Sequence, residues 1–406
     1  MDTFLIDDGR VYSYEHLLSF LNNNSSYFPL YKTECIYSLL ANLVMALANN
    51  KPLVLLDSDL NWSELEDRVD KALVNVSLPL CPSAFHSMDD VISAIQRSQS
   101  EITIFTSGTT GQPKKVTHTI PSFIRSVRLG DKYENQIWAF AYNPTHMAGL
   151  QVFFQVFMNK NTLVNIFGKS RNEVFAFVDK YQITHISATP TFYRLLLPFE
   201  REYNSVVRVT FGGEKSNERL YDSIKKIFPF AKLNNVYAST EAGSLFAAKG
   251  DCFQIPRELY NKFKIEDDEL LIHKSLLGKS DTFEFEDDYY HSGDLIEWID
   301  KKEGLFKFKS RKNELINIGG YKVNPSEVES MLLNIDGVQQ VLVYGKKNSV
   351  LGYVLCADIV LAHNSHMTEI DIREYLQEHL QDFKIPRRIR FVDSMLLTRT
   401  GKLKRI

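Results

Sequence analysis

Short apolar runs alternate with helix-length segments through the first half of this chain, and this alternation constrains its fold more than any other feature. The runs are KPLVLLD, EITIFT, IWAFAY and ITHISA, which occupy residues 51–57, 101–106, 137–142 and 183–188. Apolar residues at helical spacing predict helices over 13–22, 35–49 and 121–129. Strands that alternate with helices predict an α/β fold in which doubly covered, mostly parallel sheets form a large N-terminal domain.

Residues 263–299 follow a different pattern. Apolar and polar residues alternate here and acids are frequent, as in TFEFEDDYYHSGDLIEWI. Antiparallel strands with one solvated face show this pattern. We therefore predict a β subdomain that belongs to the N-terminal domain, which we place at residues 1–312.

The last part of the chain, residues 313–406, predicts a small α+β domain. Asn324, Pro325 and Glu327 suit the N-cap, the first and the third positions of a helix that reaches about Asn334. After it we expect a hairpin that turns at residues 346–348, a second helix capped by Thr368, and a last strand at residues 388–392. The linker between the two domains must be very short, because no low-complexity segment separates them.

Charge and cysteine content exclude several classes of protein. The 47 Lys and Arg residues against 50 Asp and Glu residues give a net charge of −3, so the chain has no general attraction for nucleic acid or for anionic membranes. The four cysteines lack the spacing of metal ligands, which favours a reduced compartment. No stretch approaches the ~18 apolar residues of a membrane span, and no leader segment is seen. We expect a cytoplasmic protein with neither a membrane nor a nucleic acid as partner.

A run of small residues directly follows the apolar run at 101–106 and predicts a phosphate-binding loop. The run comprises Thr106, Ser107, Gly108, Thr109, Thr110 and Gly111, and Lys114 follows it. Glycines let a ligand approach the backbone, hydroxyl and N–H groups donate to phosphate oxygens, and the lysine adds positive charge. The alternative is a Ser/Thr-rich surface turn, which has no need of such a run. The Walker A pattern cannot be placed here, so a kinase or GTPase loses its main support.

With several segments downstream, this loop resembles the phosphate loop of the acyl-adenylate-forming superfamily, which contains acyl- and aryl-CoA synthetases, peptide-synthetase adenylation domains and luciferases. The resemblance covers roughly residues 10–406. The matching segments follow the order of the family: Pro144–Gly149, Gly212–Glu214, Tyr237–Glu241, His291–Asp294, Ser310–Arg311, Gly319–Glu329 and Thr400–Lys402. Each segment alone is weak evidence, whereas the ordered set is highly specific.

The resemblance implies a nucleotide site. It assigns the phosphate contacts to the loop residues and Lys114. It assigns the adenine contacts to Gly212, Gly213, Glu214 and Tyr237, and the ribose contacts to Asp294 and Arg311. Asp294 alone would suit an Asx turn. Across the Glu303–Gly304 turn, however, a carboxylate and a guanidinium can share the hydroxyls of one ribose.

The resemblance also assigns the chemical step. Attack of a carboxylate on the α-phosphate of ATP brings two anions together, so the site needs cations and N–H donors. Lys402 and Mg²⁺ would supply positive charge, Glu241 would hold the metal, and Thr240 would donate to the α-phosphate. As an alternative, Glu241 merely caps a helix that begins near Thr240.

Three further roles come from the resemblance. His146 and Gly149 would border the acyl pocket, although a lone histidine is more often structural. Asn313 would be the hinge of a mobile C-terminal domain, and Gly319 and Gly320 would open a channel for a thiol. Two departures are notable, because the family commonly has Gly where this chain has Lys115, and Asp or Lys where it has Asn313.

We therefore predict a ligase that uses ATP and Mg²⁺ to convert a small carboxylic acid to an acyl-adenylate and then transfers the acyl group to CoA or an acyl carrier protein. Asn143–His146 lacks the Asp that relatives use for an amino group, which favours an uncharged acyl or aryl acid. Four aromatic residues either line the pocket for this acid or belong to the hydrophobic core: Tyr142, Phe153, Phe154 and Phe192. The alternative function is a catalytically impaired module that binds adenylate or docks a carrier protein. A nucleic-acid ligase lacks support, because no Lys-x-Asp-Gly motif occurs.

Overall fold

The structure of the chain is a computed structural model. The residues it describes are 2–60, 62, 65, 68–81, 83–105, 113–249, 251–318, 321–348, 352–362, 365–398 and 402–404. The predicted phosphate loop at 106–111 and the predicted thiol channel at Gly319 and Gly320 lie outside these ranges. Within them, no helix combines the length and the apolar character needed to cross a membrane.

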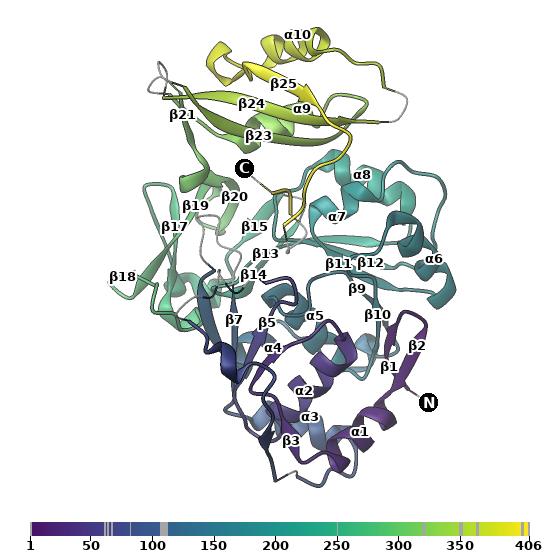
Figure 1. The fold of residues 1–406 in the computed structure, drawn as a ribbon. Helices are drawn as coiled ribbons and strands as arrows, with labels where there is room; N and C mark the ends of the chain where they lie inside the picture. The colour runs from purple at the N-terminus through teal and green to yellow at the C-terminus, as the bar shows by residue number, and fades with distance from the viewer. Residues whose placement is uncertain are drawn as a thin grey trace.

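A mixed sheet of 14 strands runs through the main body (Figure 1). In spatial order it contains β16 (Phe263–Glu266), β17 (Glu269–His273), β19 (Tyr289–Asp300), β20 (Leu305–Arg311), β15 (Cys252–Gln254), β14 (Gly243–Lys249), β13 (Lys232–Ser239), β12 (Arg208–Gly212), β11 (His185–Ala188), β9 (Ile137–Phe140), β10 (Thr162–Asn165), β1 (Thr3–Asp7) and β2 (Arg10–Ser13), with β18 (Phe285–Glu286) beside β19. The strands from β1 to β13 along this order pair in parallel, and those from β13 to β16 pair antiparallel. The predicted β subdomain is therefore a continuation of the parallel sheet, joined to it by the β13–β14 hairpin.

Helices cover both faces of the parallel part, as the sequence predicts. On one face, Val174, Ile186 and Val209 belong to a single hydrophobic core. That core is formed with α6 (Arg171–Tyr181), α7 (Pro190–Leu195) and α8 (Glu218–Ile227). On the other face lies α5 (Met147–Phe157), whose Leu150 and Phe154 pack in a second core.

A smaller sheet and its helices form the lower part of Figure 1. The sheet consists of β4 (Leu30–Lys32), β5 (Leu53–Leu56), β7 (Glu101–Phe105) and β8 (Lys115–Thr119), and β3 (Ser26–Tyr27) pairs with β6 (Leu78–Pro79). The helices are α1 (Tyr14–Asn23), α2 (Ile36–Ala48), α3 (Met88–Arg97) and α4 (Ile120–Ile124). The helix expected over 121–129 is shorter than predicted, because a turn closes after Ile124 with the Val127 N–H donating to the Ile124 carbonyl. Arg125 thereby leaves the helix and is free to reach another segment.

The C-terminal part has its own sheets and core, at the top of Figure 1. Its elements are β21 (Ile316–Ile318), β22 (Tyr321–Val323), α9 (Pro325–Leu332), β23 (Val338–Asn348), β24 (Gly352–Leu361), α10 (Glu369–His379) and β25 (Arg388–Phe391). The predicted caps are confirmed, since the side chains of Asn324 and Thr368 accept from the N–H groups of Ser326 and Asp371. The division of the chain at residues 312 and 313 stays a prediction.

Short 3₁₀ helices connect several elements: η2 (Lys71–Leu73), η3 (Asp131–Tyr133), η4 (Arg257–Lys262), η5 (Lys274–Leu276), η6 (Lys312–Glu314) and η7 (Asp382–Lys384). After β25 the chain returns to the main body (Figure 1). A bridge between Leu397 and Leu403 and a hydrogen bond from the Thr398 N–H to the Lys402 carbonyl form a local loop there. This loop places Lys402 beside the carboxyl ends of the parallel strands.

Candidate active site

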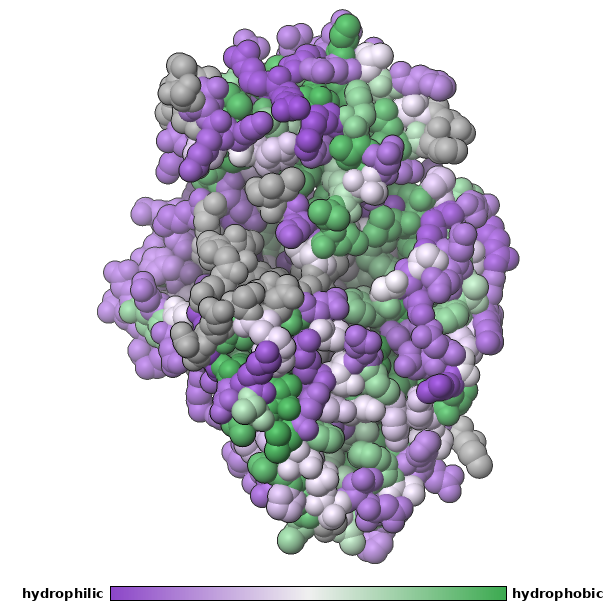
Figure 2. Space-filling model, in the orientation of Figure 1, coloured by the Kyte–Doolittle hydropathy of each residue, from purple (hydrophilic) through white to green (hydrophobic). Residues whose placement is uncertain are grey.

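A continuous cleft of ≈ 2750 Å³ lies between the C-terminal part and the main sheet. Figure 2 shows it as a hollow between the upper and lower parts of the molecule. Residues that directly follow β9, β11 and β12 line the cleft, and so does the turn after β13. Ligands of open α/β sheets bind at this edge, outside the carboxyl ends of the strands.

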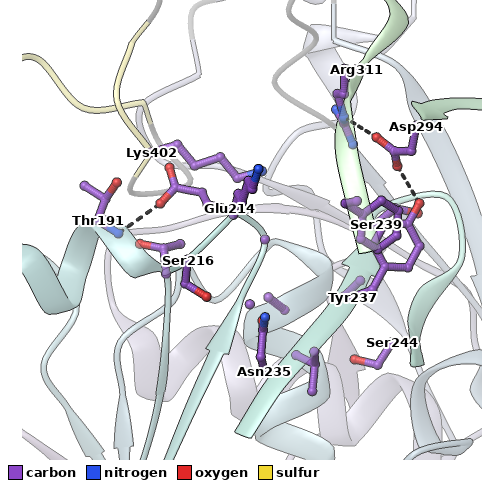
Figure 3. A pocket seen from close by; sticks show the side chains of 18 of the residues that line it. Thr191, Glu214, Ser216, Asn235, Tyr237, Ser239, Ser244, Asp294, Arg311 and Lys402 are labelled. Carbon is purple, nitrogen blue, oxygen red and sulfur yellow. Dashed lines mark hydrogen bonds and ion pairs between the residues drawn. The ribbon is translucent and has the colours of Figure 1, made fainter. Parts of the chain in front are cut away.

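Tyr237, Asp294 and Arg311 form one hydrogen-bonded corner of the cleft (Figure 3). Asp294 and Arg311 are register partners on β19 and β20, and Arg311 Nε donates to Asp294 Oδ1 at 2.8 Å. The Tyr237 hydroxyl donates to the other oxygen, Oδ2, at 2.5 Å. Asp294 is 5% exposed, so its carboxylate is held by two donors in fixed positions. The pairing of Asp294 with Arg311 expected from the sequence is therefore confirmed, whereas the contact with ribose stays a prediction.

The charges of this corner reinforce one another. The Asp294 carboxylate raises the pKa of Arg311 above its usual value. Burial, and then the neighbouring Asp294, raise the pKa of the Tyr237 hydroxyl well above its usual value. Both groups therefore keep their protons and act as donors over the physiological range.

Glu269 stabilises this corner through hydrogen bonds to neighbouring residues, and sequence reasoning missed it. Its carboxylate accepts from the Gly293 N–H at 2.9 Å and lies 3.0 Å from Lys312 Nζ and 3.2 Å from His291 Nδ1. Although Glu269 is only 3% exposed, these donors lower its pKa against the effect of burial. The carboxylate thus joins the turn before Asp294 to Lys312, the residue before the predicted hinge.

The turn between β13 and β14 carries Thr240 and Glu241, and a buried histidine fixes its backbone. His118, on β8, is 1% exposed and places its Nε2 2.8 Å from the Thr240 carbonyl oxygen. Burial lowers the pKa of His118 to about 4, so the neutral ring donates its Nε2 hydrogen to this carbonyl at physiological pH. Sequence reasoning missed His118 because 122 residues separate it from Thr240.

Two further donors hold the same turn. The Gly278 N–H donates to the Glu241 carbonyl at 2.8 Å, and the Arg125 guanidinium donates to the Ala242 carbonyl. A Cβ at residue 278 would lie 2.6 Å from the His118 ring, so only glycine fits between the ring and the turn. The backbone carbonyls of the turn are thus all engaged, while Thr240 and Glu241 line the cleft.

This donor set fits a magnesium ion that arrives with ATP. Mg²⁺ prefers oxygen ligands and is usually held by one or two carboxylates together with substrate phosphates. Within the described ranges, no cluster of three or more His, Cys, Asp and Glu side chains forms a metal cage. The carboxylate of Glu241 beside the hydroxyl of Thr240 matches such a shared site. The alternative role of Glu241 as a helix cap is wrong, because a tight β-turn and not a helix begins at Thr240.

Lys402 enters the cleft from the side opposite Asp294 and Arg311 (Figure 3). Its side chain lies against Gly213. A Cβ at Gly213 would be 3.5 Å from Lys402 Cε, and the φ of +82° at this residue also favours glycine. Next to it, the Glu214 carboxylate accepts from the Thr191 N–H at 2.9 Å. Burial lowers the pKa of Lys402, and the nearby Glu214 opposes this shift. A bound polyanion would raise the pKa of the ammonium group for the same reason.

His146 is both a wall of the cleft and a structural residue. It occupies the N-cap position of α5 and lines the cleft. Its Nε2 lies 3.3 Å from Oδ2 of the buried Asp57, and Asn143 Nδ2 donates to the same oxygen at 2.9 Å. The fold thus brings an aspartate to a segment that lacks one in sequence. The Asp57 carboxylate is engaged by these two side chains, and Asp57 does not line the cleft.

Gly149 has a packing role. A Cβ at this position would lie 2.2 Å from the Asn143 carbonyl oxygen, so the glycine lets α5 pack against the segment that precedes it. Its predicted role at the acyl pocket stays a prediction. Of the aromatic residues considered for that pocket, Tyr142 lines the cleft. The other three pack in the hydrophobic cores: Phe153, Phe154 and Phe192.

The remaining predicted positions are distributed as follows. Lys114 and Gly212 line the cleft. Asn313 lies in η6, directly after β20. The contacts expected of Thr106–Gly111 and of Gly319 and Gly320 stay predictions.

Two family models match this chain. The model described as AMP-binding enzyme matches residues 44–265, and the model described as AMP-binding enzyme C-terminal domain matches residues 327–402. The matches span the main body and the C-terminal part, which both border the cleft.

Curated relatives include the 2-succinylbenzoate–CoA ligase of Staphylococcus epidermidis, 26% identical over 337 residues that cover 74% of this chain and 68% of the relative. The 4-hydroxybutyrate–CoA ligase 1 of Metallosphaera sedula is 26% identical over 415 residues, 88% of this chain and 71% of that enzyme. Gramicidin S synthase 2 of Aneurinibacillus migulanus matches 96% of this chain at 23% identity, over 9% of its own length.

Solved structures share the fold. The o-succinylbenzoate CoA synthetase of Bacillus subtilis, in complex with its acyl-adenylate intermediate, superposes with a TM-score of 0.71 at 20% identity and covers 100% of this chain and 94% of that one. ATP-bound MatB from Rhodopseudomonas palustris gives a TM-score of 0.74 at 14% identity, over 99% and 94% of the two chains. The two-part architecture around the cleft is thus that of known adenylate-forming enzymes.

Proposed function

This chain belongs to the AMP-binding enzyme family, and from that premise we propose that it activates a small carboxylic acid with ATP and passes the acyl group to the thiol of CoA. It is an AMP-forming acid–thiol ligase, as are the CoA ligases to which it is similar. One observation supports the assignment most directly. Lys402 of the C-terminal part and the Tyr237–Asp294–Arg311 corner of the main body meet in a single cleft.

The geometry suggests how the first half-reaction proceeds. The Asp294 carboxylate and the Arg311 guanidinium are placed to accept from and donate to the ribose hydroxyls of ATP. Gly213 leaves room for Lys402 beside the nucleotide, where its ammonium group can donate to oxygens of the α-phosphate as the acid carboxylate attacks. Pyrophosphate leaves and an acyl-adenylate remains. Preorganised donors of this kind stabilise the charge that develops in the transition state.

Magnesium would be held by Glu241 together with the phosphates of ATP. When bound, it neutralises charge on the phosphates and on the departing pyrophosphate. The o-succinylbenzoate CoA synthetase of Bacillus subtilis has been solved with ATP and magnesium ion. Three donors fix the turn at residues 240–242 here, so the Glu241 side chain starts from a defined backbone position.

The second half-reaction requires a thiol acceptor. The relatives from Staphylococcus epidermidis and Metallosphaera sedula are named as CoA ligases, which favours CoA over a carrier protein. The same names, and the presence of both a lysine and a carboxylate in the cleft, disfavour the alternative of a catalytically impaired module. The acid itself is an acyl or aryl acid without an amino group, because Asp57 is engaged by His146 and Asn143.

Exchange of labelled pyrophosphate into ATP, measured with a panel of carboxylic acids, tests the first half-reaction. Thioester formation from the best acid, measured with CoA and with a phosphopantetheinylated carrier protein, tests the second. We expect acid-dependent exchange and a thioester with CoA. Absence of exchange with every acid would contradict the proposed function, and a thioester with the carrier protein alone would correct the acceptor.

A further inference from the structure

One face of the main sheet forms the floor of the cleft below the reactive end, and its side chains are arranged in rows. Strand register places Gly212 beside Val236, at the end near Lys402. Two residues earlier on each strand, Ser187, Thr210 and Asn234 form a row of small polar side chains. All of these residues line the cleft. The floor below the reactive end is therefore polar rather than aliphatic.

The next row ends in two cationic side chains. It consists of register partners on four neighbouring strands that all line the cleft: Trp138, His185, Arg208 and Lys232. Within the part of the chain that the structure describes, neither Arg208 nor Lys232 forms an ion pair. At the rise of parallel strands, four residues span roughly 13 Å, which is the separation of Arg208 from Gly212 along β12.

Helix α5 covers this floor. Gln151 on α5 lines the cleft and is 9% exposed. Its Oε1 accepts from the Ser244 hydroxyl at 2.9 Å. The helix therefore adds a polar side chain opposite the polar row of the sheet.

We propose that the acid activated by this enzyme is a dicarboxylic acid, whose second carboxylate lies at the Arg208 and Lys232 end of the cleft. This inference rests on the proposed function and names its substrate class. One carboxylate reacts beside Lys402, the chain lies between α5 and the row formed by Ser187, Thr210 and Asn234, and the distal carboxylate accepts from the Arg208 guanidinium. A monocarboxylic acid would leave the polar floor and both cations without a ligand partner.

The test compares pyrophosphate exchange with dicarboxylic acids and with monocarboxylic acids of the same chain lengths. The wild-type protein should show a kcat/KM at least about tenfold higher for the preferred dicarboxylic acid, because hydrogen bonds to charged groups contribute about 1.5–3 kcal/mol. Arg208→Met should reduce the ratio of the two kcat/KM values by about tenfold to a hundredfold. Lys232→Met, which removes an exposed side chain, should reduce the same ratio by only a few fold.

Arg201→Met is the matched control, since it removes an arginine that binds Asp179 outside the cleft and should leave the ratio unchanged. Thermal unfolding of each variant checks its folding, and the exposed Lys232 provides the test if Arg208→Met does not fold. Preferred use of monocarboxylic acids, or an unchanged ratio with a raised KM for CoA in Arg208→Met, would overturn the inference and leave the ligase function standing. Absence of exchange with every acid would instead reject the proposed function itself.

Discussion

The two sides of the cleft are built in different ways. The corner of Tyr237, Asp294 and Arg311 is fixed by strand register and by hydrogen bonds of 2.5 and 2.8 Å within one sheet. Lys402, in contrast, belongs to a segment that returns from the C-terminal part and is secured by local contacts, a bridge between Leu397 and Leu403 and hydrogen bonds between Thr398 and Lys402. The nucleotide side is thus preformed, whereas the reactive lysine depends on where the C-terminal part sits.

Polar contacts between the two parts, among the residues that the structure describes, include three that help to define that position. Arg219 on α8 donates to the Leu333 carbonyl at 3.0 Å and to Asp336 at 2.5 Å. Asn324 Nδ2 donates to the Lys309 carbonyl at 3.0 Å. Polar contacts of this kind can break and re-form, as a part that changes position between two half-reactions requires. The following predictions test whether the nucleotide side of the cleft is fixed while Lys402 is brought into the cleft by movement of the C-terminal part.

The largest effect is expected at Lys402. Loss of one charged donor from a transition state costs about 10²–10³ in rate, so Lys402→Ala should slow pyrophosphate exchange by that factor. Thioester formation from preformed acyl-adenylate should stay near the wild-type rate, because a delivered lysine would serve the first half-reaction alone. Equal slowing of both half-reactions would show that Lys402 is a permanent part of the site.

A smaller and more uniform effect is expected in the preformed corner. Asp294→Asn removes the charge between two donors but preserves the shape of the side chain. The KM for ATP should rise by about tenfold to a hundredfold, because a charged hydrogen-bond partner is lost in the ground state and the transition state alike. Tyr237→Phe is the milder comparison and should raise the KM by only a few fold. An effect on kcat alone would contradict a static ribose site.

Glu241 tests the fixed turn. Glu241→Gln retains the size of the side chain and removes the charge that attracts Mg²⁺. The Mg²⁺ concentration for half-maximal pyrophosphate exchange should rise, by about tenfold or less, since the phosphates of ATP supply the other ligands. A titration curve identical to that of the wild-type protein would show that Glu241 does not support the metal.

Arg219 tests whether the position of the C-terminal part affects the first half-reaction. Arg219→Ala removes the contacts with Leu333 and Asp336, one of which involves a fully exposed carboxylate. Exposed pairs contribute about 0–1 kcal/mol, so exchange should slow by only a few fold while thioester formation from acyl-adenylate is unaffected. Lys226→Ala, on the same helix and exposed, is the control. Slowing of the thioester step alone would mean that Arg219 stabilises the opposite arrangement.

The smallest effect concerns the pH dependence of stability. The pKa of His118 is lowered from 6.5 to about 4 in the folded protein, so the unfolded chain binds the proton first as the pH falls. Its contribution to stability is therefore complete above pH 6.5 and is lost between pH 6.5 and about 4. His118→Gln can still donate to the Thr240 carbonyl but does not titrate. Its Tm should fall less over this range than that of the wild-type protein, and parallel curves would contradict the shift.

Local sequence patterns determined much of this protein. The alternation of apolar runs and helices, the caps at Asn324 and Thr368, and the pairing of Asp294 with Arg311 follow from residues close together in the chain. Such features depend on backbone preferences and on strand pairing across a short turn, which neighbouring residues encode. The ordered motifs are by themselves sufficient to indicate an adenylate-forming enzyme.

Only the tertiary structure decided which distant groups meet. His118 holds a carbonyl 122 residues away, Asp57 holds His146 across 89 residues, and Glu269 joins Gly293 to Lys312. The row of Arg208 and Lys232 depends on the register of parallel strands that are joined through helices. These contacts depend on long-range packing, because a buried polar group requires a partner and the fold alone determines which segment supplies it.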